Sequence, residues 1–157
     1  MIRILFVCYA NICRSPMAEA IMRHLVAEAG LSDRILVDSA GTNVFEPDAP
    51  AYDLVEDVLQ RNRIPVDSAA RQVLFEDLHT FDYVLAMDRR NLAFLLRNAA
   101  SAKAEVRQFL HDAYNRDLVD HVEVEDPYPY GDFEYTFEVI HTGCRVLLEQ
   151  IRAKHGL

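Results

Sequence analysis

A cysteine and an arginine stand at the two ends of a short loop near the start of the chain. Leu5–Ala20 reads LFVCYANICRSPMAEA, in which Cys8 ends an apolar run and a helical pattern follows Arg14. Where a strand enters a helix through such a loop, backbone N–H groups and the positive end of the helix dipole converge and favour an anion. Arg14 adds a planar fork of donors that fits two oxygens of a tetrahedral oxyanion.

The chemistry that suits this loop is covalent phosphoryl transfer. The positive surroundings favour the thiolate form of Cys8, which is the nucleophilic form of a cysteine. Cys8 would attack phosphorus while Arg14 holds the equatorial oxygens in the transition state. Ser15 can hydrogen-bond the sulfur and make it a better leaving group in the second step. A lone cysteine at a strand end is more often a small buried apolar residue, but the strand–loop–helix setting favours catalysis.

Alternating strands and helices must position this loop. Apolar runs and helical periodicity predict strands at Ile2–Val7, Arg34–Ser39, Phe81–Met87 and Glu105–Leu110, and helices from Pro16 to Gly30, over Ala51–Asn62, after Asp88 and over Phe133–Lys154. The polar segment Asp112–Gly131 is predicted to be a loop.

Such alternation indicates right-handed βαβ units around a parallel sheet that is covered on both faces. We therefore predict one α/β domain over residues 1–157, a three-layer, flavodoxin-like sandwich with a central four-stranded parallel sheet flanked by helices. Sites in such sheets form at the carboxyl ends of strands, where Cys8 lies.

Composition narrows the class of protein and its partners. The chain has 157 residues, of which 51% are hydrophobic and 26% charged, and a net charge of −9. This is typical of a soluble globular protein, and the charge argues against nucleic acid as a partner. The first apolar run is too short for a secretion signal, and no stretch reaches the ~18 apolar residues of a membrane helix. Because the chain also has an odd number of cysteines, three, we predict a cytoplasmic location and no membrane partner.

The loop sequence also resembles a known family. VCYANICRSPMAEA is similar to the active-site signature of low-molecular-weight protein tyrosine phosphatases. The likeness continues in SAGT (Ser39–Thr42), ARQV (Ala70–Val73), FDYVLAMDRRNL (Phe81–Leu92) and DPYPYG (Asp126–Gly131), and so spans nearly the whole chain.

The resemblance implies hydrolysis of phosphotyrosine through a phosphocysteine, with no metal or other cofactor. It makes Cys8 the nucleophile and Arg14 the phosphate clamp of a Cys-x5-Arg loop. Asp126 becomes the general acid that protonates the phenolic leaving group and then activates water. The phosphate-binding loop then consists of Tyr9, Ala10, Asn11, Ile12, Cys13 and Arg14.

Further residues are assigned supporting roles by the resemblance. The side chains of Asn11 and Ser39 would bond to each other and hold the loop. Cys13 would form a reversible disulfide with Cys8 or merely pack. Tyr128 and Tyr130 follow the acid, and one of them would flank the pocket and stack on a substrate ring; the pair is also a candidate phosphorylation target, and Tyr130 could equally be an ordinary loop tyrosine.

The sequence departs from the family pattern near the loop. Ala10 replaces a glycine, which would cost about 1 kcal/mol if that position needs left-handed backbone. Tyr9 is bulky and would narrow or lengthen the pocket wall. Phe45 is the candidate for the aromatic wall that is commonly a tryptophan, and Ser68 replaces a supporting histidine.

Other functions stay open at this stage. A protein-arginine phosphatase shares the loop but carries threonine at the position of Ile12. An arsenate reductase needs two further neighbouring cysteines, and only Cys144 is left. From other classes, a non-catalytic phosphotyrosine-binding module would not need Cys8 or Asp126. The cysteine and histidine spacings do not fit a zinc site, and the loop lacks the glycine-rich, lysine-ended pattern of nucleotide binding.

We expect a monomer whose partner is a phosphotyrosine protein, such as a bacterial tyrosine kinase or a host protein.

Overall fold

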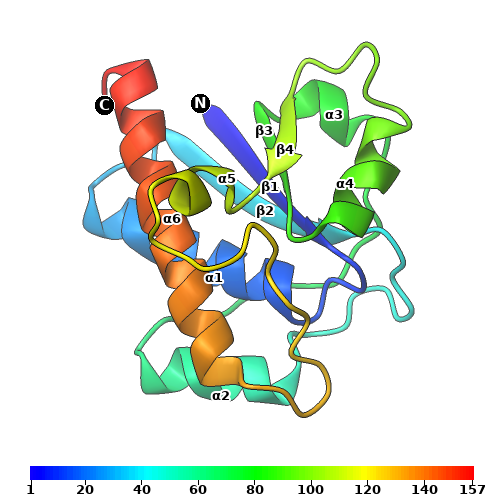
Figure 1. The fold of residues 1–157 in the computed structure, drawn as a ribbon, viewed down its shortest axis with the longest axis vertical. Helices are drawn as coiled ribbons and strands as arrows, with labels where there is room; N and C mark the ends of the chain where they lie inside the picture. The colour runs from blue at the N-terminus through cyan, green and yellow to red at the C-terminus, as the bar shows by residue number, and fades with distance from the viewer.

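The computed structural model describes residues 1–157, which form a four-stranded parallel sheet with helices on both faces (Figure 1). The elements are β1 (Ile2–Cys8), α1 (Arg14–Glu28), β2 (Ile35–Gly41), α2 (Asp53–Arg61), α3 (Asp77–Thr80), β3 (Tyr83–Ala86), α4 (Arg89–Leu96), β4 (Glu105–Gln108), α5 (His111–Asn115) and α6 (Phe133–His155). The strand order is β2-β1-β3-β4. The predicted fold class is confirmed.

β1 lies in the middle of the sheet and separates two hydrophobic cores. It pairs along its whole length with β2, and Ile4–Val7 pair with β3. Because successive strand residues point to opposite faces, Ile4, Phe6 and Cys8 enter the larger core, whereas Leu5 and Val7 enter the smaller one. Cys8 therefore ends the central strand β1 on the side of the larger core.

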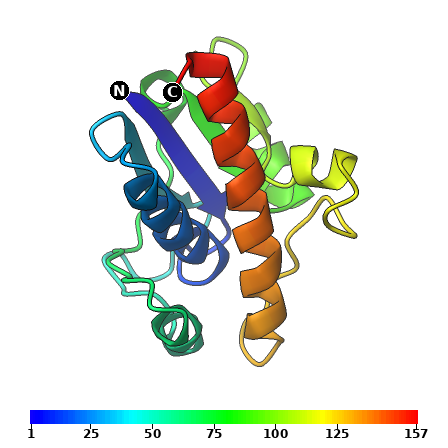
Figure 2. The same cartoon turned by 90° about the vertical axis from the view of Figure 1, so that its left-hand side faces the viewer.

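The larger core lies beneath α1 and α6, and the smaller one beneath α3 and α4. Figure 2 shows α1 and α6 side by side over one face of the sheet, with the two termini near the same end of the molecule. Gly143 allows α6 to pack closely against the segment that follows β4, because a Cβ there would lie 2.6 Å from side-chain atoms of Phe109 and Leu110. None of the helices is both long enough and apolar enough to cross a membrane.

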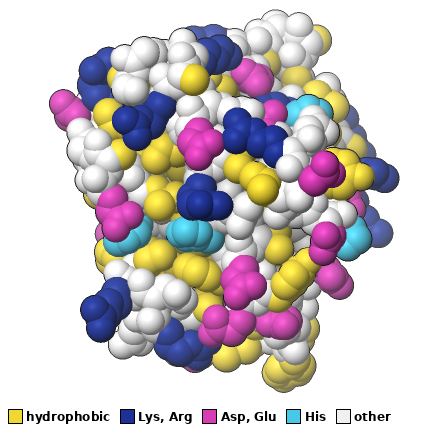
Figure 3. Space-filling model, turned by 60° about the vertical axis from the view of Figure 1, so that its left-hand side comes forward, with side chains coloured by type: hydrophobic (Ala, Val, Ile, Leu, Met, Phe, Trp, Pro, Cys, Tyr) yellow, Lys and Arg dark blue, Asp and Glu magenta, His cyan; other side chains and the backbone are white.

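The surface carries charges of both signs. On the face drawn in Figure 3, basic and acidic side chains are interspersed with apolar ones, and no basic stripe is visible.

Element boundaries differ from the predictions in informative places. α1 begins at Arg14, so Pro16 is its third residue and not its first. α3 was not predicted, and α5 lies partly in the segment predicted to be a loop. Helices of four or five residues carry too little periodicity to be recognised, and they depend on tertiary contacts. The predicted cap is confirmed, because the Asp88 carboxylate accepts a hydrogen bond from the Asn91 N–H at 2.8 Å.

Candidate active site

The Cys8 thiol and the Arg14 guanidinium lie in one cavity at the carboxyl end of β1. The cavity has a volume of about 270 Å³ and is lined by Cys8, Tyr9, Ala10, Ile12, Cys13, Arg14, Phe45, Asp126 and Tyr128. The fold thus brings together residues from the start, the middle and the end of the chain. Most of the predicted site residues line this space.

The loop between β1 and α1 lines this cavity and leaves its backbone N–H groups without partners in the protein. No N–H group from Tyr9 to Ser15 donates a hydrogen bond to another protein group. The loop carbonyls are held from outside instead, since Thr42 N–H donates to the Cys8 oxygen and Asn43 N–H donates to the Tyr9 oxygen. Together with the N-terminus of α1, the free N–H groups form a cradle suited to an oxyanion.

Asn11 gives the loop its sharp turn. Its φ is 58°, in the left-handed region that asparagine tolerates better than most residues. Its side-chain nitrogen donates to Ser39 Oγ at 2.9 Å and to Ser15 Oγ at 2.8 Å, and its oxygen accepts from the Arg71 N–H. Ala10 does not have positive φ, so the substitution of alanine for the family's glycine causes no strain of this kind.

The strand that follows must approach the loop closely. A Cβ on Gly41 would lie 2.7 Å from the carbonyl oxygen of Tyr9. Real Cβ atoms do not come this close to an oxygen, so a larger residue would push the loop away. This explains why glycine stands inside the SAGT segment.

Arg14 is held by partners that the sequence did not reveal. Its Nη1 donates to the Asp88 carboxylate at 2.7 Å and to the carbonyl oxygen of Val124 at 3.0 Å. Burial opposes the charge of Arg14, but the nearby acidic groups Cys8, Asp88 and Asp126 outweigh it and raise the guanidinium pKa. Arg14 is therefore a fixed cation at the base of the cavity.

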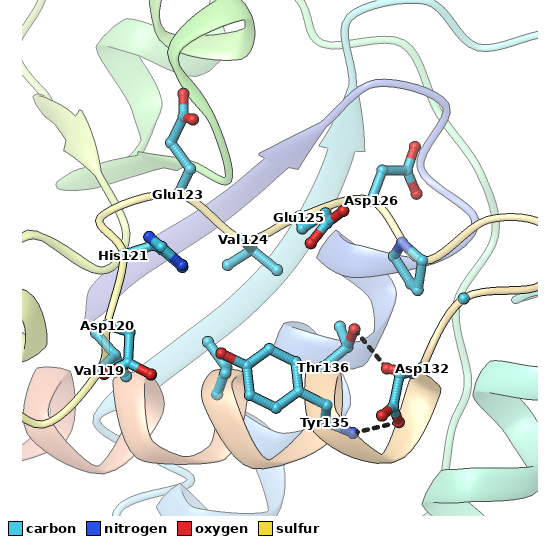
Figure 4. Close-up of a pocket in the computed structure, with 13 residues that line it drawn as sticks. Val119, Asp120, His121, Glu123, Val124, Glu125, Asp126, Asp132, Tyr135 and Thr136 are labelled. Carbon is cyan, nitrogen blue, oxygen red and sulfur yellow. Dashed lines mark hydrogen bonds between the residues drawn. The ribbon is translucent and has the colours of Figure 1, made fainter.

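Asp126 lies at the mouth of the same cavity. Its side chain is 47% exposed, and Oδ2 lies 3.7 Å from Arg14 Nη2. Its Oδ1 accepts a hydrogen bond from the Tyr128 N–H at 3.1 Å. A second cavity of about 130 Å³ adjoins this segment, and Figure 4 shows the Asp126 carboxylate pointing away from Tyr135 and Asp132, which line it.

The two cysteines of the loop have different surroundings. Cys8 Sγ lies 2.9 Å from Ser15 Oγ. Burial, followed by the negative charges of Asp126 and Cys8, raises the pKa of Cys13 to about 12, so Cys13 is a protonated thiol at neutral pH. All three cysteines are free in this structure.

Three aromatic rings line the cavity, Tyr9, Phe45 and Tyr128, and each makes an edge-on contact with another ring. Tyr9 and Phe45 have ring centroids 5.7 Å apart, and Tyr128 lies 5.0 Å from Tyr52. Tyr130, which we predicted as a wall residue, does not line the cavity, and 89% of it is exposed. Tyr52 was missed because it precedes a helix far from any active-site motif in the sequence.

Comparison with known proteins agrees with this arrangement. A family model described as low molecular weight phosphotyrosine protein phosphatase matches residues 3–156. The chain belongs to this family. The low molecular weight protein-tyrosine-phosphatase YfkJ of Bacillus subtilis is 42% identical over 160 residues, which is 100% of both chains. The human low molecular weight phosphotyrosine protein phosphatase is 40% identical and covers 94% of each chain.

Solved structures of similar proteins have the same fold. The crystal structure of YfkJ superposes with a TM-score of 0.91 at 40% identity, covering 98% of this chain and 96% of that one. The Drosophila arginine phosphatase DARP superposes with a TM-score of 0.87 at 29% identity, covering 97% and 98%. YfkJ is named a protein-tyrosine-phosphatase and DARP an arginine phosphatase, so the two names differ in the phosphorylated amino acid.

Several positioning residues were not predicted from the sequence. Asp88 was recognised as a helix cap but not as the anchor of Arg14. Glu19, which is buried, hydrogen-bonds Ser39 from α1. Arg71 ion-pairs with Asp38 and Asp77 and so fixes the backbone that holds Asn11. No group of three or more histidine, cysteine, aspartate or glutamate side chains is placed to share a metal ion.

Proposed function

We propose that this chain hydrolyses phosphotyrosine in proteins, with Cys8 as the nucleophile. The observation that carries the proposal is the common cavity, in which the Cys8 sulfur and the buried Arg14 lie beside free backbone N–H groups. Those donors match the three equatorial oxygens of a phosphoryl group in transfer. The whole of residues 1–157 would act as one phosphatase domain.

The reaction takes place in two displacements. In the first, the Cys8 thiolate attacks phosphorus, the bond from phosphorus to the phenolic oxygen breaks, and the Asp126 carboxyl group gives that oxygen a proton. In the second, the Asp126 carboxylate takes a proton from water, the water oxygen attacks phosphorus, and the sulfur–phosphorus bond breaks. Inorganic phosphate leaves, and Cys8 returns as a thiolate.

The apolar lining supports an aromatic substrate. Tyr9, Ile12, Phe45 and Tyr128 surround the entrance, and Asp126 is the only carboxylate side chain among the lining residues. A phenyl ring needs such a surface and few hydrogen-bond partners. In this proposal Tyr128 and Phe45 contact the substrate ring, while Tyr130 has no role in the cavity.

Arginine phosphatase is the alternative, because the fold is shared with DARP. A phosphoguanidine carries several N–H donors that need acceptors when buried. The single carboxylate of the cavity and the apolar Ile12 supply few acceptors, so the tyrosine ester is favoured. The physiological partner, a kinase or a host protein, stays a prediction, as do the monomeric state and the cytoplasmic location.

The test compares wild type with Cys8→Ser on matched phosphotyrosine and phosphoarginine peptides, under reductant. We expect phosphate release from the tyrosine peptide, and its complete loss in the variant. Binding of the phosphotyrosine peptide by Cys8→Ser separates lost chemistry from lost structure. Release from phosphoarginine alone would favour the alternative, and binding without turnover by wild type would indicate a binding module.

A further inference from the structure

A buried chain of hydrogen bonds runs from the Cys8 sulfur to the far side of α1. Cys8 Sγ contacts Ser15 Oγ, and Ser15 and Ser39 both accept from the side-chain nitrogen of Asn11. The Ser39 hydroxyl then donates to the carboxylate of Glu19, a residue that is only 3% exposed. These residues lie on β1, the loop, α1 and β2, so the chain of bonds crosses three elements.

The direction of each hydrogen bond in this chain follows from its ends. The Arg71 N–H donates to the Asn11 oxygen at 3.0 Å, so the Asn11 nitrogen must face the two serines. That nitrogen has two hydrogens, and each serine takes one. Ser39 therefore directs its own proton to Glu19, and the proton of Ser15 is left for either the Cys8 sulfur at 2.9 Å or the Ala40 oxygen at 3.4 Å.

The ionised state of Glu19 is what keeps Ser39 as the donor in the hydrogen bond between them. A carboxylate only accepts hydrogen bonds, whereas a protonated carboxyl group could donate to Ser39 and reverse the bond. Burial raises the pKa of Glu19, while the Ser39 hydrogen bond and Arg23 oppose that shift. Asp38 and Asp67 also face Glu19 and raise its pKa.

Arg23 is the cation that pairs with Glu19, at the end of the hydrogen-bond chain that lies away from Cys8. Its Nη2 lies 2.7 Å from Glu19 Oε1, one helical turn away on α1. The same guanidinium donates to the carbonyl oxygens of Val37 on β2 and Asp67, which hold it in place. Arg23 and Glu19 line a cavity of about 220 Å³ together with Ser68. The Ser68 hydroxyl has no hydrogen-bond partner, so it does not help to hold Glu19.

We propose that Arg23 is a positioning residue for the reaction: by keeping Glu19 ionised, it directs the proton of Ser15 toward the Cys8 sulfur. The inference depends on the proposed role of Cys8 as nucleophile. Without Arg23, Glu19 becomes protonated more readily, and Ser15 can turn its proton to the Ala40 oxygen, 3.4 Å away. The thiolate then loses a donor, both as attacking group and as leaving group.

The test measures Cys8 directly as well as turnover. Arg23→Met should raise the midpoint of the pH profile for iodoacetate alkylation of Cys8 and lower kcat about five- to tenfold, the effect of one weakened hydrogen bond. The burst of p-nitrophenol before steady state should become more prominent, because release of the sulfur from phosphate is slowed. Arg23→Lys should restore both quantities to near wild type.

Two further variants separate positioning from loss of fold. His24→Ala removes the neighbouring ion pair with Glu28 on the same helix and should leave alkylation and kcat unchanged. Glu19→Gln keeps the shape of the side chain but removes its charge, and its NH2 group can donate to Ser39 as a protonated carboxyl group would. It should therefore shift the alkylation profile in the same direction as Arg23→Met. Melting temperatures record any loss of stability in each variant.

The outcomes distinguish this inference from the proposed function. If Arg23→Met and Glu19→Gln melt earlier but keep the wild-type alkylation profile and kcat, Arg23 is merely structural and the inference is overturned. If wild type hydrolyses no phosphotyrosine, the proposed function fails, whereas the alkylation profiles still decide whether Arg23 acts on Cys8.

Discussion

At the scale of single residues, two carboxylates beside Arg14 have different surroundings. Asp88 is tied to Arg14 at 2.7 Å and to the start of α4. Asp126 is looser, since it lies 3.7 Å from Arg14 and is half-exposed at the cavity mouth. An acid that must exchange protons with a leaving group and then with water needs such freedom. This contrast supports Asp126 as the carboxyl group that transfers protons and Asp88 as the carboxylate that holds Arg14 in place.

Asp126→Asn should therefore lower turnover according to the leaving group. The fall in kcat should be about 10²- to 10⁴-fold for phenyl phosphate and much smaller for p-nitrophenyl phosphate, whose leaving oxygen scarcely needs a proton. Steady-state kinetics with both esters measure this difference. Asp120→Asn, in the same segment but outside the main cavity, is the matched control. Equal losses on the two esters would count against Asp126 as the acid.

At the scale of elements, the site lies where β1 and β3 end and where α1 and α4 begin. β1 and β3 run parallel, so Cys8 and Asp88 emerge at the same edge of the sheet. Asp88 then serves two elements at once, because one oxygen caps α4 and the other holds Arg14 at the start of α1. The stability of α4 and the placement of the phosphate clamp thus share one side chain.

Two substitutions of Asp88 should separate those tasks. Asn is as good an N-cap as Asp, so Asp88→Asn should leave the melting temperature close to wild type but raise KM and lower kcat, since Arg14 loses its charged partner. Asp88→Ala should show the same kinetic defect and also lose about 1 kcal/mol of unfolding free energy with the cap. Kinetics and urea denaturation on both variants give the comparison. Unchanged kinetics in Asp88→Asn would mean that Val124 alone suffices to hold Arg14.

At the scale of the whole molecule, the fold keeps a carboxylate buried between α1 and β2. Glu19 is enclosed where the helix covers the sheet, and its pKa is raised from the ordinary value of 4.5 chiefly by burial. The folded chain therefore binds this proton more tightly than the unfolded chain does. The stability contributed by Glu19 is fully present below pH 4.5 and is lost as pH rises through the folded-state pKa.

Glu19→Gln lacks a titrating group at this position, so comparing its stability with that of wild type should reveal the contribution of Glu19. The unfolding free energy of the variant minus that of wild type should rise as pH increases from 4.5 through the folded-state pKa of Glu19, and then level off. Urea denaturation at several pH values measures it, and His24→Ala controls for a nearby change that leaves Glu19 intact. A difference that is constant or falls with pH would show that Glu19 is not shifted in this direction.

The sequence by itself determined the class of fold and the centre of the site. Apolar runs and helical periods are local signals, and they located every strand and the four longer helices of the chain. The Cys8–Arg14 loop could be recognised because its chemistry lies within seven consecutive residues. A nucleophile, a clamp and a helix start in so short a segment need no tertiary contact to be identified.

Only the tertiary structure decided which distant residues support that loop. Asp88 and Val124 reach Arg14 from 74 and 110 residues away, and nothing local in the sequence marks them as its partners. The structure also placed the left-handed turn at Asn11 and moved Tyr130 out of the cavity. Hydrogen bonds between side chains on different elements depend on how helices pack against the sheet, and that packing is fixed by the whole core at once.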